Sequence, residues 1–428
     1  MRLSILLNRG ESIKKIKKIV WFSSGLLQSG GGERLILEGI KHFENMGIET
    51  YLLVYNFDKK VALDETYNPN VFLIGKDIEK SNPLYPKLLT SLMRIFILRK
   101  KIICINPDII ISQGQWGDSV PPYIATLYTS YPHAVHVFGS MFSFSDEFSK
   151  YTFIFKRHFN EIRQSVFGYK EIIPTKSPKL GLIKRTKLEI EAFLKYLSVN
   201  NAKIIFVLSN QNKWEVKKLY GRNAIVLRGA FQKSIFDYEP KESIKQKLNL
   251  IDKKIILNIN RLVPKKRVDL CIRAFEMIAK KRKDVFLVIG GTGPEENNLR
   301  ELVKQLDLQS YIKFVGFIPE KELWDYYLCC DVFVQLDLAD FNIAPFVALA
   351  LGRKVVWSTE MEIDEDLKQN RFIFPTNPEV IDVVTAIENA LTAELCDLNL
   401  TEKQILSYYT WENYFSEILR EMEAVCES

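Results

Sequence analysis

Two basic side chains and a run of glycines are the residues of this sequence best placed to do chemistry. Arg261 and Lys266 follow the apolar segment KIILNIN, and the turn GGTGP at 290–294 follows a second apolar segment, DVFLVIG. Fixed positive charges beside glycines, where backbone N–H groups can approach a ligand closely, suit phosphate oxygens. The pattern therefore predicts a binding site for a diphosphate.

The elements that must position these residues are parallel strands. Between 254 and 358, short apolar segments alternate with amphipathic stretches, which is typical of a parallel sheet covered by helices on both faces. Ligands of such sheets bind beyond the carboxyl ends of the strands. Because the basic loop and the glycine turn both begin at those ends, we expect them to share one edge of the sheet.

The N-terminal half repeats this alternation. The predicted strands include KKIVWFSSGLL, IETYLLVYN, NPDIIISQG, PHAVHVFG and AKIIFVLSN, and GGGERLILEGIKHFENMG is a predicted helix. We expect an α/β protein with two facing doubly wound, Rossmann-like domains at 1–240 and 253–402. A helical insertion is expected at about 140–195, and a periodic helix at 403–428 is expected to return toward the N-terminal domain.

Composition narrows the class of partner. With 428 residues, 47% of them hydrophobic, the chain can build two cores of ordinary size. The net charge of +7 favours an anionic small molecule or a membrane surface and disfavours nucleic acid. Six cysteines without CxxC spacing favour a reducing compartment, and four histidines without ligand-like spacing argue against zinc. We expect a cytoplasmic protein without an export signal or a membrane-spanning run.

One predicted helix offers a second kind of surface. LYPKLLTSLMRIFILRKK places Lys87, Arg94, Arg99, Lys100 and Lys101 beside a leucine and isoleucine face. Such a helix could lie peripherally on an anionic membrane, or it could show its charges to water while its apolar stripe packs on the core. The aromatic and basic insertion leaves a similar choice between inward packing and an acceptor-side surface.

Four motifs in order, GGGER, RLVPKKR, GTGPE and GFIPEKEL, resemble those of one family. The chain is similar to nucleotide-sugar-dependent glycosyltransferases of the GT-B fold, in particular to the retaining group called family 4. The likeness covers nearly the whole chain and is strongest from 254 to 358. GTGP alone is a weak signal, and the order and spacing of the four motifs make the resemblance specific.

The resemblance implies roles for the matching positions. Arg261 and Lys266 are implied to hold the donor's diphosphate and to stabilise the leaving group, so that neither a metal nor another cofactor is needed. The implied donor-binding residues are Gly30, Gly31, Gly32, Gly291, Gly293, Phe317, Ile318, Asn342 and Ile343. The structural alternatives are a solvated loop for the cations, tight turns for the glycines and a buried strand end around Phe317.

Two glutamates of the family's donor motif are missing. The alignment of FVQLDLADFNIAPFVALALG to that motif places Ala339 and Val347 at their positions. Asp340 stands beside the first position as a candidate catalytic substitute, and Asp337 is a further candidate. Loss of two charged hydrogen bonds would cost about 3 to 6 kcal/mol, so diphosphate binding could survive where turnover did not.

A histidine that the family commonly places at the end of PHAVHVFG is missing as well. Phe138 occupies its position, and His136 lies two residues earlier on the same face of the predicted strand. His136 is therefore a candidate catalytic residue, with a satisfied core histidine as its alternative.

Three functions follow from these features. The first is transfer of a sugar from a nucleoside-diphosphate sugar to a hydroxyl of a lipid-linked or cell-surface glycan precursor. The second is a catalytically degenerate subunit that binds a partner glycosyltransferase or a glycan, since the usual carboxylates are replaced. The third is a nucleotide-sugar epimerase, which would need an acid and a base facing the sugar. The acidic triplet at 364–366 is expected to begin a helix and to bind no metal.

Overall fold

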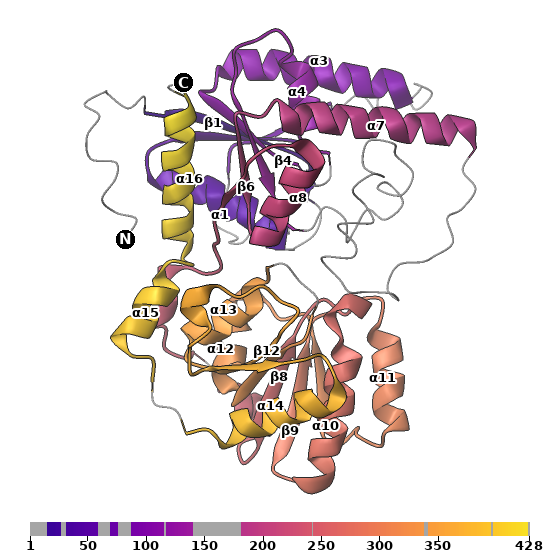
Figure 1. Ribbon diagram of the computed structural model, residues 1–428, viewed down its shortest axis with the longest axis vertical. Coiled ribbons are helices and arrows are strands. Elements are labelled where there is room, and N and C mark those ends of the chain that lie inside the picture. The colour runs from indigo at the N-terminus through magenta and orange to yellow at the C-terminus, as the bar shows by residue number, and fades with distance from the viewer. Residues whose placement is uncertain are drawn as a thin grey trace.

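The computed structural model describes most of the chain in two α/β domains, one above the other in Figure 1. The described residues are 15–26, 31–58, 69–75, 87–114, 117–139, 181–241, 243–337, 341–394 and 397–426. Residues 141–180, which hold most of the expected helical insertion, lie outside this part.

The N-terminal domain contains a seven-stranded parallel sheet in the order β3-β2-β1-β4-β5-β6-β7. Its strands are β1 (Lys18–Leu26), β2 (Glu49–Phe57), β3 (Val71–Leu73), β4 (Ile109–Gln113), β5 (His133–Val137), β6 (Ile204–Val207) and β7 (Ile225–Val226). Its helices are α1 (Gly31–Asn45), α3 (Lys87–Ile105), α4 (Val120–Ala125), α7 (Leu182–Asn200) and α8 (Asn210–Tyr220). The central strands are apolar throughout because helices cover both faces: α1 packs on one face, and α3, α4, α7 and α8 pack on the other.

The C-terminal domain contains a six-stranded parallel sheet in the order β10-β9-β8-β11-β12-β13. Its strands are β8 (Lys254–Ile259), β9 (Val285–Gly290), β10 (Ile312–Gly316), β11 (Val332–Gln335), β12 (Lys354–Ser358) and β13 (Ile373–Thr376). Its helices are α9 (Ile244–Lys247), α10 (Val268–Lys281), α11 (Glu296–Gln305), α12 (Glu320–Cys329), α13 (Ile343–Ala350), α14 (Val380–Thr392) and α15 (Leu400–Ser407). The expectation of two doubly wound, Rossmann-like domains is confirmed.

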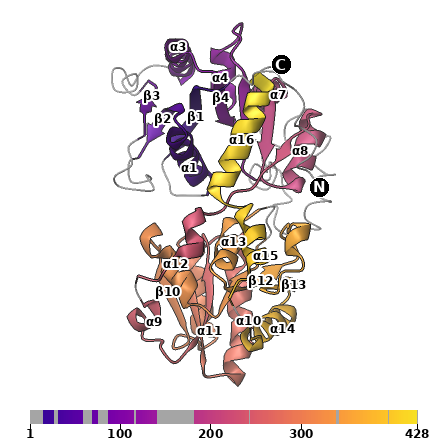
Figure 2. The ribbon, with the colours of Figure 1, turned by 90° about the vertical axis from the view of Figure 1, so that its left-hand side faces the viewer.

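The last helix, α16 (Trp411–Cys426), leaves the C-terminal domain and packs against α1 in the N-terminal domain (Figures 1 and 2). Its aromatic face is anchored by Trp411 and Phe415, which join the core beside Trp21. A Cβ on Gly39 would lie 2.6 Å from a Trp21 ring carbon and 2.8 Å from a Phe415 ring carbon, so α1 approaches both rings closely because this residue is glycine. The return of the C-terminal helix is therefore confirmed.

The chain crosses between the domains twice, and the two crossings lie side by side. The amide of Ala230 donates to the carbonyl of Tyr409 at 2.8 Å, and the amide of Trp411 donates to the carbonyl of Phe231 at 2.8 Å. These bonds pair the segment that follows β7 with the segment that joins α15 to α16. The relative position of the domains is therefore fixed by two chain segments that pair with each other.

Candidate functional site

The basic loop begins at the carboxyl end of β8, as the strand pattern predicted. Arg261 is exposed and makes no ion pair with any described residue. Lys266 ends a short 3-10 turn, and its ammonium forms an ion pair with the carboxylate of Asp337, which follows β11. Because β8 and β11 are neighbours in the sheet, these two positions, far apart in sequence, meet at one edge.

Asp337 is completely buried and its carboxylate is fully engaged. Oδ2 accepts hydrogen bonds from Lys266 and, at 2.9 Å, from Nδ2 of Asn342; Oδ1 accepts from Nε2 of Gln335. A buried charge requires such partners, because desolvation otherwise costs several kcal/mol. Asp337 therefore has no exposed carboxylate oxygen with which to replace the glutamates that the resemblance leads one to expect, and instead it holds Lys266 and Asn342 in place.

A chain of buried amides supports this ion pair. Nε2 of Gln335 donates to Oδ1 of Asn260 at 2.8 Å, and Nδ2 of Asn260 donates to Oδ1 of Asn258 at 3.2 Å. Nδ2 of Asn258 donates to the carbonyl of Val334 at 2.9 Å. The network thus connects β8 to β11 beneath the basic loop. Sequence reasoning missed these amides, although polar residues inside apolar strands were a visible signal of a buried network.

Asn342 also begins α13 as its N-cap. Its Oδ1 accepts a hydrogen bond from the amide of Ala344 at 3.3 Å while its Nδ2 binds Asp337. Ile343, next in the chain, is half-buried and packs against the cores of both domains. Its Cδ1 lies 3.9 Å from the place where a Cβ on Gly31 would stand. The start of α13 therefore faces the glycine turn that opens α1.

In the N-terminal domain, Gly31 and Gly32 form the start of α1, and Gly30 lies outside the described residues. A Cβ on Gly32 would lie 3.2 Å from the ring of Phe138, the residue expected from the resemblance to stand in place of a histidine. Arg34, one turn along, reaches across to the other domain, where its Nη2 lies 2.5 Å from Oε1 of Glu320 at the start of α12. The structure thus brings the glycine turn of α1 next to elements of the C-terminal domain.

Gly291 and Gly293 hold the basic loop by close backbone packing. Gly291 has φ +108°, and a Cβ on it would lie 1.9 Å from the carbonyl oxygen of Asn260. A Cβ on Gly293 would lie 2.2 Å from the carbonyl oxygen of Leu262. The amide of Leu262 in turn donates a hydrogen bond to the carbonyl of Thr292 at 3.0 Å. These glycines therefore have a structural role in supporting Arg261, whether or not they also contact phosphate.

The remaining expected donor-binding residues differ in exposure. Phe317 follows β10 and presents its ring to solvent with 64% exposure, whereas Ile318 is 8% exposed and packs into the core against Gly290. Val347, which the resemblance places at the position of the second glutamate, is 3% exposed within α13. Asp340 and Ala339 lie outside the described residues.

His136 is a core residue. It is 1% exposed, and its Nε2 shares a 2.6 Å hydrogen bond with the hydroxyl of Tyr414 on α16. Burial lowers the pKa of His136 to about 3, so the imidazole stays neutral at physiological pH. This geometry corrects the catalytic assignment, because the ring faces the returning helix and is closed off from solvent. Its partner, 278 residues away, carried no signal in the sequence.

A second interdomain cluster lies near the crossing. The guanidinium of Arg228 pairs with Glu362 and Asp364, which follow β12. Glu362 also accepts from the amide of Asn210 at 2.9 Å, so its carboxylate caps the positive end of α8. Asp364 is thus held by Arg228 and by the hydroxyl of Tyr409. Of the acidic triplet at 364–366, Asp364 therefore belongs to the domain junction, whereas Glu365 pairs locally with Lys368 at the start of a short 3-10 turn.

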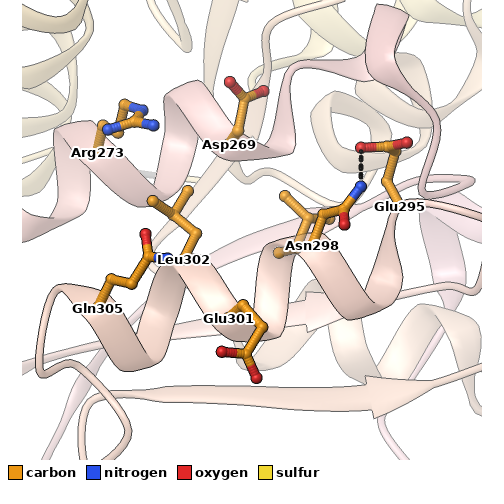
Figure 3. A pocket seen from close by; sticks show the side chains of 8 residues that line it. Asp269, Arg273, Glu295, Asn298, Glu301, Leu302 and Gln305 are labelled. Carbon is orange, nitrogen blue, oxygen red and sulfur yellow. Dashed lines mark hydrogen bonds between the residues drawn. The ribbon is translucent and has the colours of Figure 1, made fainter.

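A pocket lies in the groove between α10 and α11 (Figure 3). Nδ2 of Asn298 donates to Oε2 of Glu295 at 3.1 Å at the start of α11. Its lining residues are Asp269, Arg273, Glu295, Asn298, Leu299, Glu301, Leu302 and Gln305. Three carboxylates against one guanidinium would repel a phosphate, so the pocket is a poor diphosphate site. Among the described residues, no group of three or more His, Cys, Asp or Glu side chains could hold a metal ion.

Comparisons with known proteins bear on the C-terminal domain and on the fold. Residues 240–405 match the family model described as glycosyl transferases group 1. An uncharacterized glycosyltransferase of Methanocaldococcus jannaschii is 26% identical over 239 residues, 52% of this chain and 60% of that protein. The GPI3 subunit of phosphatidylinositol N-acetylglucosaminyltransferase from Saccharomyces cerevisiae is 23% identical over 177 residues, 40% of this chain and 39% of that one. The chain spans less than two thirds of the length of these curated relatives.

The architecture matches solved glycosyltransferase structures along almost the whole chain. Anabaena HepE in complex with UDP superposes with a TM-score of 0.67 at 15% identity, covering 96% of this chain and 100% of that one. At this identity the likeness shows the fold alone, which is the GT-B arrangement of two facing Rossmann-like domains. Residues 240–405 thus match the glycosyl transferases group 1 family model, within a chain whose two domains have the GT-B architecture.

Proposed function

We propose that this protein transfers a sugar from a nucleoside-diphosphate sugar to a hydroxyl of a lipid-linked or cell-surface glycan precursor. The observation that carries the proposal is the basic loop at the carboxyl end of β8, where Arg261 is exposed and Lys266 is fixed by Asp337. A departing nucleoside diphosphate gains negative charge, and preorganised cations stabilise it without a metal or another cofactor.

The relatives support the donor and acceptor classes. HepE was solved with UDP, and the yeast relative is named for the transfer of N-acetylglucosamine to phosphatidylinositol. In this chain the exposed ring of Phe317, at the same edge of the sheet, is suited to stack on a nucleotide base. We therefore propose a nucleotide sugar as donor and a lipid-linked hydroxyl as acceptor.

Calorimetric titration of the purified protein with UDP, GDP and their sugars tests the donor site. We expect Arg261→Ala to weaken diphosphate binding by about 10- to 150-fold, because a hydrogen bond to a charged group contributes roughly 1.5 to 3 kcal/mol. The matched control is Arg273→Ala, which removes another exposed guanidinium, from the α10–α11 pocket, and should leave binding unchanged. Equal affinities of wild type and Arg261→Ala would refute the assignment.

A second candidate function, a degenerate subunit of a partner glycosyltransferase, is favoured by one specific observation. Val347 is a buried apolar residue, and the carboxylate of Asp337 is already bound by Lys266, Gln335 and Asn342. Neither position therefore offers a carboxylate to the donor sugar. In that case the protein would bind nucleoside diphosphate without transferring or hydrolysing sugar, and a partner enzyme would lose activity in its absence. An epimerase is disfavoured, because two of the candidate acid–base groups, Asp337 and His136, are buried.

A further inference from the structure

Helix α3 is apolar on two opposite faces. Its inner face, with Leu98, Ile102 and Ile105, is buried against the sheet of the N-terminal domain. On the opposite side, five large apolar side chains remain exposed at helical spacing: Leu89 (40%), Leu92 (56%), Met93 (36%), Phe96 (57%) and Ile103 (50%). Their spacing of three, four and seven residues aligns them in one stripe. The inner face of α3 belongs to the core of the N-terminal domain, whereas the core formed by the described residues does not include the outer stripe.

The charge on α3 is entirely of one sign. The helix contains five Lys and Arg residues and no Asp or Glu. Lys100 lies within the stripe, its Nζ 4.7 Å from the centroid of the Phe96 ring, and Lys101 lies over Phe72 at 3.4 Å. Arg99 donates to the carbonyls of Ala125 and Leu127, at 2.7 and 3.1 Å. The apolar stripe is thus bordered by cations and has no acidic residue of its own helix beside it.

A neighbouring turn extends this surface. The contact from Arg99 holds the end of α4, where Tyr128 is fully exposed beside Leu127, which is 38% exposed. An exposed tyrosine next to an apolar, basic helix is suited to the boundary between water and lipid. Figures 1 and 2 both show α3 at the end of the molecule farthest from the C-terminal domain, so the surface is accessible without obstruction of the donor side.

We propose that this surface, the outer stripe of α3 with the Leu127–Tyr128 turn, docks the protein on an anionic phospholipid bilayer. Apolar side chains enter the headgroup region while the bordering cations contact anionic lipids. A second copy of this chain is a poorer occupant, because two α3 helices without acidic residues would bring like charges together. The inference goes beyond the proposed glycosyl transfer, since it concerns lipid headgroups and requires neither donor nor acceptor.

Vesicle co-sedimentation tests the proposal with the full-length protein and no nucleotide sugar. The test variant is Leu92→Ser/Phe96→Ser, and the matched control is Ile251→Ser/Leu400→Ser, which alters two exposed apolar residues of the C-terminal domain. We expect wild type and control to bind vesicles containing phosphatidylglycerol and the test variant to bind about tenfold or more weakly. Binding should fall with added salt and be weak on pure phosphatidylcholine.

Three results would overturn the proposal: no binding by wild type, equal binding by both double variants, or equal binding to neutral and anionic vesicles. Light scattering addresses the second copy: a wild-type dimer that the test variant converts to a monomer, without vesicle binding, would reassign the stripe to a protein interface. Thermal unfolding and UDP titration of the same variants show whether a loss of vesicle binding comes from misfolding, and they keep the test independent of the proposed transfer. Both should match wild type, because the altered side chains are exposed and distant from the basic loop.

Discussion

Removal of the Lys266 side chain should destabilise the C-terminal domain as well as alter the proposed donor site. The side chain of Lys266 is 16% exposed, and that of its partner Asp337 is 0% exposed. Lys266→Ala would leave that carboxylate buried with only amide donors from Gln335 and Asn342. Breaking a buried ion pair from one side costs about 3 to 5 kcal/mol, a large share of the roughly 5 to 15 kcal/mol that stabilises a typical protein.

Urea unfolding followed by circular dichroism and tryptophan fluorescence measures this cost. Arg261→Ala is the matched control, because it removes an exposed cation from the same loop and should change stability by no more than about 0.5 kcal/mol. Asp337→Asn supplies the double-mutant cycle. In the Lys266→Ala background it neutralises the stranded charge and should recover much of the lost stability, with a coupling of about 1 to 3 kcal/mol.

The reasoning would be wrong if Lys266→Ala cost no more than Arg261→Ala, or if the two substitutions at 266 and 337 were additive. Either result would mean that the ammonium and the carboxylate do not form a pair in solution. If the coupling is found, weakened donor binding by Lys266→Ala alone cannot be attributed to a lost phosphate contact. Arg261→Ala is then the cleaner probe of the donor site.

Burial lowers the pKa of His133 to about 4 and of His136 to about 3, so the stability that their neutral forms contribute is complete above the unfolded pKa near 6.5 and is lost as pH falls. At about pH 5 each of these two histidines should lower the free energy of unfolding, measured with urea, by roughly 2 kcal/mol. His136→Gln should remove about half of this pH dependence. Gly39→Ala should lower stability by about 1 to 3 kcal/mol, because its Cβ would clash with two aromatic rings, whereas Gly181→Ala, with open space around it, should be tolerated; equal thermal shifts would contradict the packing. Arg228→Ala should cost about 1.5 to 3 kcal/mol and loosen the domain arrangement in small-angle scattering, and an unchanged profile would show that the two paired crossings suffice.

The parts of the fold that could be predicted from sequence are those determined by local pattern. Strands such as β8 and β9 are continuous apolar runs because helices cover both faces of a parallel sheet, and that pattern is visible in one dimension. The short strands β3 and β13 were not predicted, since three or four half-buried residues leave too weak a pattern. The position of Arg261 followed directly, because it is the second residue after a strand whose direction was known.

The contacts that decide the role of each residue depended on partners distant in sequence. Lys266 and Asp337 are separated by 71 residues and meet because β8 and β11 are adjacent in the sheet order. His136 depended in the same way on Tyr414, contributed by the returning helix. Sequence pattern indicates that a polar group is present near a strand end. Only topology shows whether another polar group satisfies it or whether it remains available for a ligand.

This distinction predicts which of the two cations contributes more to the proposed donor site. The ion pair of Lys266 with Asp337 adds no net charge to the loop, whereas Arg261 contributes a full positive charge. The double variant Lys266→Ala/Asp337→Asn removes one charge of each sign, so the long-range attraction for a diphosphate should be preserved. We therefore expect Arg261→Ala to weaken UDP binding more than the double variant does. Arg261→Ala should also reduce the salt dependence of UDP binding more strongly. The opposite order in calorimetric titrations would mean that the diphosphate displaces Asp337 from Lys266 and takes the ammonium as its main contact.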